Sequence, residues 1–379
     1  EIPIAIFPTT ENLIRLGLNL LPRNPIATGG KSIQEYQNDL VDTIFDRAPL
    51  RQFDVIDADS SAGDLEVSFN SNGLDFSEDL SLTNQYFDLG GLSAWGKGFG
   101  GSTSAFQYKE TRYGEFGNWE STHAGTAVGV DYAFDSHFKV GAFGNWGNVN
   151  VTHLGLAGGS WNPQGWGGGL TATYSESNFY AQALLGASGF SGNHKRYLLP
   201  VGSYQGGTAK GTKSTTSYVG ALRVGSPQQL GSVLLEPQLT GTWNHNQDHA
   251  WSESGGDVFN LKYKTFSDNF LQTLLAVKVS LPVNSGDRAL FNPFIRAGWI
   301  ADWDLNNADA KVTNISTRRS IGIPIIQDDE HGLLLEGGLD YTINNLDSTS
   351  FKLYAKGGIE LWDNDQKDTD WRVSGGVTF

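Results

Sequence analysis

Apolar and polar residues alternate with a period of two in one segment after another, from about residue 92 to the C-terminus. In the last segment, Trp371, Val373, Val377 and Phe379 alternate with polar residues such as Arg372. Successive side chains of a β-strand point to opposite faces, so each segment predicts a strand with one apolar and one polar face. Clear segments cover 233–243, 271–281, 291–303, 333–343, 351–362 and 371–379, and weaker, Gly-rich ones cover 92–107, 122–134, 137–150, 165–175, 178–190 and 214–225.

These twelve predicted strands favour a closed barrel in a membrane. Each has roughly ten residues or more, which is enough to cross an outer membrane when tilted. Short connections alternate with long ones, which is typical of barrels with periplasmic turns and extracellular loops. The long loops are predicted at 108–121, 151–164, 191–213, 244–267 and 304–330. We therefore predict an all-β fold, a transmembrane antiparallel β-barrel of about twelve strands over 91–379, with its C-terminus on the periplasmic side.

Composition supports this prediction. The chain has 48 glycines, 12% aromatic and only 18% charged residues, whereas a soluble domain has about 25% charged residues. No stretch approaches the ~20 apolar residues of a transmembrane helix. A soluble β-sandwich or a lipocalin-like barrel is the alternative, but long strands with aromatic ends fit a lipid-facing band better. The net charge of −15 argues against a nucleic-acid partner.

The first 90 residues differ from the rest and are expected to form a separate N-terminal segment. A helix is predicted over 32–48, because Ser32 and Glu35 form a capping box and Pro49 ends the pattern. An apolar stripe and an acidic stripe run along it; the acidic stripe consists of Glu35, Asp39, Asp42 and Asp46. Residues 51–90 are predicted to be an acidic loop with a short hairpin near 65–69. Because the chain starts at Glu1 without an export signal, we expect it to be a processed product.

The polar strand faces predict a charged barrel lumen. The basic residues expected there are Lys139, Arg223, Lys278, Arg296, Lys352, Lys356 and Arg372. The acidic ones are Asp131, Glu236, Glu336, Asp340 and Glu360. Opposite charges attract more strongly in a low-dielectric lumen than in water. We therefore hypothesise that helix 32–48 plugs the pore through its acidic stripe.

Several segments resemble the C-terminal translocator domain of autotransporters (type V secretion). The residues that carry the likeness are 93–101, 125–132, 140–144, 179–183, 235–239 and the terminal Phe379. The resemblance implies a barrel of twelve strands, a helix threaded through the pore and an N-terminal passenger exported to the surface of a Gram-negative cell. This chain departs from the family in one respect, because about forty residues separate Pro49 from the first strand.

The resemblance also implies partners and site residues. The expected partners are outer-membrane lipid and lipopolysaccharide, the barrel assembly machinery and the passenger itself. The assembly signal would be the C-terminal aromatic strand of Phe379, Val377, Val373 and Trp371, although Phe379 could equally be an ordinary interface aromatic. In some autotransporters an Asn of the pore helix cleaves its own backbone, so Asn38 and Asp39 are a candidate self-cleavage site. The alternative is an ordinary polar helix position.

No pattern predicts an enzyme, a cofactor or a metal. The glycines of 96–101 match a dinucleotide fingerprint, but that motif needs a strand–helix junction. Cysteine is absent, which excludes thiolate chemistry. The acidic runs at 302–306 and 363–370 lack the EF-hand pattern and are predicted to be solvated loops. The alternative functions are a stand-alone porin or channel plugged by 1–90, and a barrel-rim enzyme or adhesin.

Overall fold

A computed structural model describes residues 15–17, 19–20, 23–46, 56–57, 92–105, 118–135, 137–154, 158–176, 178–284, 289–305, 309–324, 329–344, 350–363 and 369–378. Twelve long strands form a barrel: β2 (Leu92–Ala105), β3 (Asn118–Ala133), β4 (Phe138–Leu154), β5 (Gly159–Glu176), β6 (Phe179–Leu198), β7 (Gly207–Gly225), β9 (Val233–Asp248), β12 (Phe266–Ser280), β14 (Ala289–Asp304), β17 (Glu330–Asn344), β18 (Ser350–Trp362) and β19 (Thr369–Thr378). The other elements are α2 (Arg23–Phe45), β1 (Ile56–Asp57), β8 (Gln228–Leu230), β10 (Trp251–Ser252), η3 (Asp257–Phe259), β11 (Leu261–Tyr263), β13 (Val283–Asn284), β15 (Asp309–Asn314) and β16 (Ser320–Pro324).

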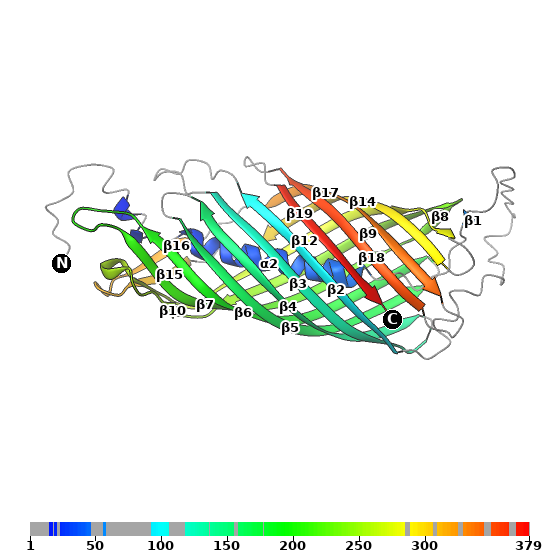
Figure 1. The fold of residues 1–379 in the computed structure, drawn as a ribbon, viewed down its shortest axis with the longest axis horizontal. Coiled ribbons are helices and arrows are strands. Elements are labelled where there is room, and N and C mark those ends of the chain that lie inside the picture. Colours follow the sequence, from blue (N-terminus) through cyan, green and yellow to red (C-terminus); the bar gives the residue numbers. More distant parts are fainter. Residues whose placement is uncertain are drawn as a thin grey trace.

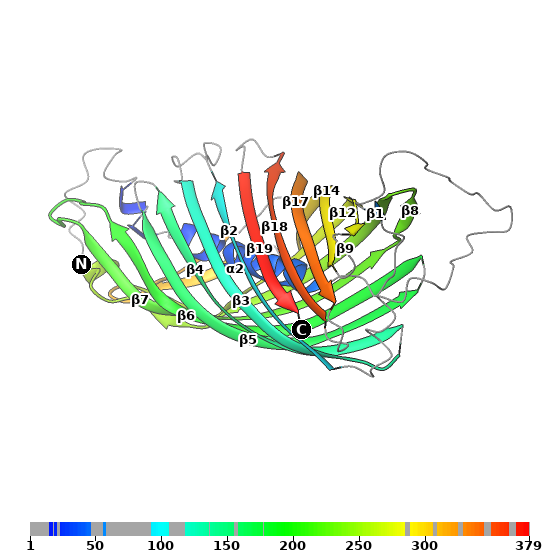
Figure 2. The same cartoon turned by 45° about the vertical axis from the view of Figure 1, so that its right-hand side comes forward.

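The twelve long strands close into one antiparallel barrel. Each pairs with its neighbour along the chain, and the last strand, β19, pairs with the first, β2. Figure 2 shows this closure, where β2 lies beside β19. Full closure leaves no unpaired strand edge, which a sheet in a lipid bilayer requires. The predicted fold class, a transmembrane antiparallel β-barrel of twelve strands, is confirmed.

Most strands extend further at the long-loop end than predicted. β6 runs to Leu198 instead of 190, and β7 begins at Gly207 instead of 214. The predicted loop 151–164 is mostly strand, because β4 and β5 continue through it. The outward residues of a strand are apolar only where they contact lipid. The apolar–polar alternation is therefore lost where a strand leaves the membrane, although its backbone pairing continues.

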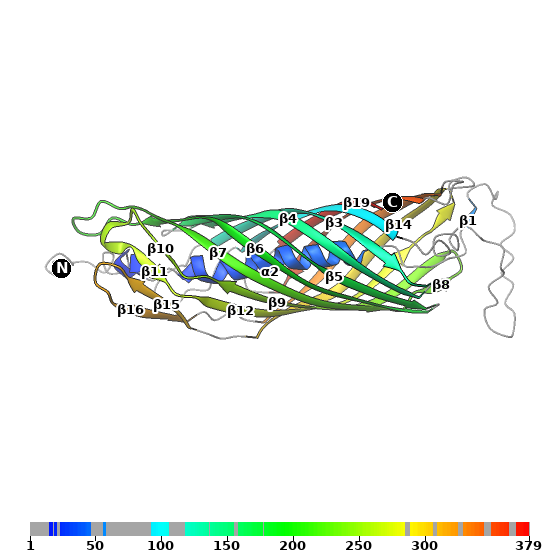
Figure 3. The ribbon, with the colours of Figure 1, turned by 90° about the horizontal axis from the view of Figure 1, so that it is seen from below.

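The predicted loops 244–267 and 304–330 are also partly wrong. They contain a second, four-stranded antiparallel sheet in the order β10–β11–β15–β16. Its inward side chains form an apolar cluster of their own, built on Leu261, Tyr263 and Val312. Figure 3 shows this sheet at the end of the barrel where α2 begins. Strands of two to six residues carry too few alternations to stand out from a polar loop.

The outer wall of the barrel is apolar. Leu185, Leu222, Leu275 and Leu333 are all more than half exposed, although a soluble protein rarely exposes a large continuous apolar surface. No helix among the described residues has both the length and the apolar character to cross a membrane.

Helix α2 lies inside the barrel, along its long axis (Figures 1 and 3). Its 23 residues correspond to about 35 Å. The helix begins nine residues before Ser32, so the predicted capping box is wrong and Ser32 is an internal, buried position. The hairpin expected near 65–69 lies outside the described residues.

Close packing accounts for the two glycines in the first half of α2. A Cβ atom added at Gly29 would collide with Lys213, and one at Gly30 would collide with Asp268. Asn246 also donates a hydrogen bond of 3.0 Å to the carbonyl of Gly30. Two glycines argue against a helix on propensity alone. Here the contacts with the surrounding wall offset that propensity, because glycine lets the helix approach Lys213 and Asp268 closely.

Candidate functional site in the barrel lumen

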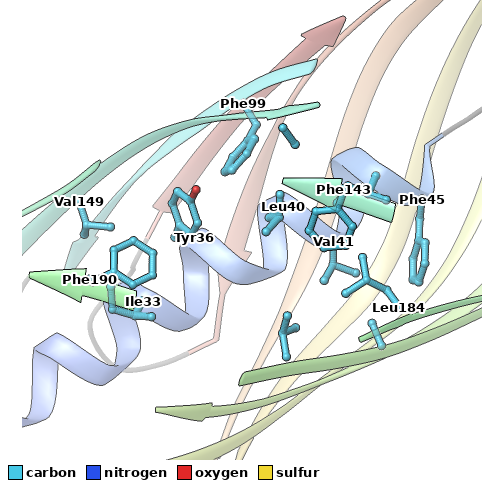
Figure 4. Close-up of a cluster of buried hydrophobic side chains, with 14 of the residues drawn as sticks. Ile33, Tyr36, Leu40, Val41, Phe45, Phe99, Phe143, Val149, Leu184 and Phe190 are labelled. Atoms are coloured by element: carbon cyan, nitrogen blue, oxygen red, sulfur yellow. The ribbon is translucent and has the colours of Figure 1, made fainter. Parts of the chain in front are cut away.

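The apolar face of α2 packs against one side of the barrel wall. Ile33, Tyr36, Leu40 and Ile44 are almost completely buried. They belong to one cluster with wall residues of β2 to β7, which Figure 4 shows. The four positions recur at helical spacing, so they form one stripe. This side of the lumen therefore binds the helix through apolar packing.

Tyr36 is the best-fitted side chain of that stripe. Its ring centre lies 5.1 Å from the ring centres of both Phe99 and Phe190, and its hydroxyl accepts a hydrogen bond of 3.1 Å from Asn145. The ring also covers a glycine of the wall, because a Cβ atom added at Gly147 would collide with it. The wall is thus hollowed at the level of Tyr36.

The acidic face of α2 meets basic residues from four strands, β7, β14, β18 and β19. Asp42 forms ion pairs with Arg223, Lys356, Arg296 (2.6 Å) and Arg372 (3.8 Å). All five side chains are buried. A buried carboxylate is tolerated only when it is paired and hydrogen-bonded. Asp42 is therefore the centre of the contact between helix and wall.

Asp46, one turn further on, pairs with the same wall. Its carboxylate lies 2.8 Å from Arg223 and also pairs with Lys356, and it accepts a hydrogen bond of 2.9 Å from the hydroxyl of Tyr354. Just beyond the end of α2, the ammonium of Lys97 donates 2.7 Å to the carbonyl of Thr43. A cation at this position satisfies a carbonyl that the helix leaves free and complements the helix dipole.

The wall supplies acids of its own to this network. Glu336 accepts hydrogen bonds of 2.5 Å from Arg296 and 2.7 Å from Arg372, and Arg372 also lies 3.0 Å from Glu360. Without the helix, the four wall cations would have only these two carboxylates as ion-pair partners among the described residues. Asp39 and Asp42 of α2, and Asp46 just beyond its end, bring further negative charge to them.

The other predicted residues have different partners. Glu35 pairs with no basic residue in the described part of the chain, whereas Asp39 lies 2.8 Å from His123 and 3.6 Å from Arg372. Three of the predicted lumen cations interact with wall residues instead of the helix: Lys139 with Asp131 at 4.0 Å, Lys352 with Asp340 at 3.4 Å, and Lys278 with the ring of Phe294 at 4.1 Å.

The remaining site predictions are not tested by these contacts. Asn38 is buried, and its side-chain oxygen accepts a hydrogen bond of 2.9 Å from Asn244; cleavage between Asn38 and Asp39 stays a prediction. Phe379 lies outside the described residues. Val373 is half exposed on the outer wall, and its role in an assembly signal also stays a prediction.

Sequence reasoning missed two contacts of the helix region. Lys31 lies 2.8 Å from both Asp302 and Glu330. Asp302 belongs both to the predicted strand 291–303, on its polar face, and to the acidic run 302–306 that was predicted to be a solvated loop. The strand prediction is confirmed and the loop prediction is wrong for this residue, because Asp302 is a buried lumen residue of β14. In the described part of the chain, no three His, Asp or Glu residues gather as metal ligands would.

A second contact of the N-terminal segment lies at the mouth of the barrel. The side chain of Asn19 donates 2.9 Å to the carbonyl of Leu199 and accepts 2.9 Å from its amide. Arg196 donates to both oxygens of Glu253, at 2.9 and 2.6 Å, and to the carbonyl of Asn19 at 2.7 Å. The segment before the helix is thus held by the loop that follows β6.

Comparisons with known proteins agree with this geometry. The family model of the autotransporter β-domain matches residues 94–356. The translocator domain of the autotransporter NalP from Neisseria meningitidis superposes with a TM-score of 0.56, at 14% identity over 76% of this chain and 88% of that one. The β-domain of the Bordetella autotransporter BrkA gives a TM-score of 0.55, at 15% identity over 76% and 98%. No curated protein sequence matches significantly.

Proposed function

Because the chain belongs to the autotransporter family, we propose that its barrel exports an N-terminal passenger and then holds it at the cell surface. The barrel itself is an outer-membrane translocator barrel. The passenger and its route are the proposal. The single observation that supports them is the position of the chain's own helix α2 inside the lumen, where its acidic face neutralises the wall.

The proposed direction of export is based on the course of the chain. Residues 15–17, 19 and 20 lie at the end of the barrel with the long strand extensions and the second sheet, and α2 enters the lumen from there. The proposal assigns this end to the cell exterior and the short turns, with the C-terminus, to the periplasm. Asn19 and Arg196 would then keep the exit end of the segment in place after export.

A stand-alone porin is the less supported alternative. A diffusion pore needs an open lumen, but α2 fills this one with buried apolar packing on one side and ion pairs on the other. The proposal also assigns no catalysis to the barrel, since its buried acids and bases neutralise one another. Under this proposal the chain acts as an export pore that its own helix closes, and then as an anchor.

Surface display tests the proposal. The full chain, with an export signal and an epitope tag placed before Glu1, would be produced in a Gram-negative host. We expect protease added to intact cells to remove the tag. A matched control carries the same tag in the β3–β4 turn after Ser136, where we expect protection until the outer membrane is opened. Protection of the first tag on intact cells, with the barrel folded, would contradict the proposed route.

A further inference from the structure

The basic residues of the described chain fall into two groups. Those in the lumen are at least partly buried, and the pairs given above account for most of them. Seven are exposed: Lys195, Lys210, Lys262, Lys264, Lys311, Arg318 and Arg319. None of the seven has a carboxylate partner within 4.0 Å in the part of the chain that the structure describes. All seven lie at the end of the molecule that carries the second sheet.

Five of them, the lysines, lie on or beside one continuous sheet surface. Lys195 of β6 is directly opposite Lys210 of β7, which in turn bridges to Ser254. The surface continues through the second sheet, where Lys262 pairs with Ser252 and Thr313. The side chains that alternate with these, such as those of Arg196, Glu253, Leu261 and Val312, are buried on the inner face. The lysines therefore share the outer face; we call Lys195, Lys210, Lys262, Lys264 and Lys311 the basic face.

The basic face continues the lipid-facing wall. Leu185 and Lys195 are an even number of residues apart on β6, and Tyr218 and Lys210 are likewise on β7, so each pair points to the same side. Leu185 and Tyr218 are exposed on the outer wall. Eight residues at ~3.3 Å and a tilt of ~45° place Lys210 roughly 19 Å above Tyr218 along the membrane normal. With this end of the barrel outside the cell, as the proposed function has it, this height lies on the headgroup side of the outer leaflet.

The positive charges of the basic face favour binding of an anion. Like charges directly opposite each other on neighbouring strands repel, as Lys195 and Lys210 do. The whole chain carries a net charge of −15, so a cluster of unpaired cations departs from the general trend. Exposed carboxylates on these elements are few; Asp257 and Asp309 are the described examples.

We propose that the basic face binds the phosphate groups on the sugar core of lipopolysaccharide in the outer leaflet. The ammonium of lysine is a compact phosphate partner. The lipid chains of the same molecule would cover the apolar wall below. The contact would fix the barrel's height and rotation in the membrane while α2 and its exit segment stay free of lipid.

Native mass spectrometry of the full chain in detergent tests this proposal. The protein would be titrated with lipopolysaccharide that carries a phosphorylated inner core, and with the same material after phosphatase treatment. The variant replaces each of the five lysines with glutamine. We expect its apparent affinity to fall by at least about tenfold, since a basic side chain near an anionic surface contributes appreciably to binding. We also expect phosphatase treatment to weaken binding by the native chain.

A matched control removes negative charges in place of positive ones. Asp257→Asn with Asp309→Asn changes exposed residues of the same elements and should leave the affinity unchanged or raise it. The heat-dependent gel shift of folded barrels shows that each variant folds. Equal affinity of the native chain and the lysine variant would overturn the proposal. So would a native chain that binds a soluble sulfated polysaccharide through these lysines but does not bind lipopolysaccharide.

Discussion

Replacing Asp42 by asparagine should loosen α2 from the barrel wall. The side chain keeps its size but loses its charge, and four buried cations, Arg223, Arg296, Lys356 and Arg372, lose a shared partner. Removing one member of a buried ion pair costs about 3–5 kcal/mol. Because Asp46 and Glu336 still contact several of these cations, we expect the lower end of that range, about 3 kcal/mol.

That loss can be measured as amide hydrogen exchange of peptides from residues 31–45 in the folded full-length barrel. About 3 kcal/mol corresponds to roughly a hundredfold faster exchange, provided that the amides exchange when the helix undocks. Strand peptides of the barrel, such as those of β5, should keep their protection. This contrast separates undocking of the helix from unfolding of the barrel.

Glu35→Gln is the matched control for this prediction. Glu35 belongs to the same acidic stripe but pairs with no basic residue among those described. Its neutralisation should therefore change helix exchange by much less than that of Asp42. If the two variants exchange alike, the ion-pair network does not hold the helix, and apolar packing around Tyr36 accounts for its position.

Three further predictions follow from other contacts. Gly147→Val places side-chain atoms where the ring of Tyr36 and the carbonyl of Ala124 lie. It should destabilise helix docking by about 1–3 kcal/mol, seen as faster exchange of the helix peptides in the same assay, and unchanged exchange would contradict the close fit of Tyr36 against the wall. Asn19→Ala removes two hydrogen bonds to Leu199, worth about 1 kcal/mol each. Limited proteolysis before residue 23 should therefore be faster while the barrel stays intact. Unchanged proteolysis would contradict a role of these hydrogen bonds in holding the segment. In the β3–β4 turn, the backbone amides of His137 and Phe138 donate hydrogen bonds to the Asp135 carboxylate and lower its pKa. The ionised carboxylate therefore stabilises the turn above the ordinary aspartate pKa, and this stabilisation is lost as the pH falls through the lowered pKa. NMR titration of Asp135 should show a midpoint below that of Asp135 in an unfolded peptide.

The barrel was predictable because lipid imposes a pattern on it. Leu339, Tyr341 and Ile343 alternate with Asp340 and Thr342, and twelve segments with such alternation predicted the number of strands. The acidic stripe of the helix was visible for the same reason, as a repeat at helical spacing. Both signals are periodic, so they can be recognised in the sequence without knowledge of tertiary contacts.

Other features could not be found this way. The first half of α2 contains Gly29 and Gly30, which lie close to Lys213 and Asp268, and such tertiary contacts offset the low helix propensity of glycine. Lys97 was missed as a helix cap because its strand shares an inward face with Trp95 and Phe99. On that side the apolar residues face the helix as well as the lipid, and alternation no longer tells inside from outside.

Single-channel conductance in a planar bilayer tests the central claim most directly, that the chain's own helix closes the pore through which it was threaded. The full chain would be compared with a chain that begins at Leu92. We predict a nearly closed full-length barrel and a steady, larger conductance for the shortened one. Equal conductance of the two would contradict the claim, because it would mean that α2 does not occupy the pore in a membrane.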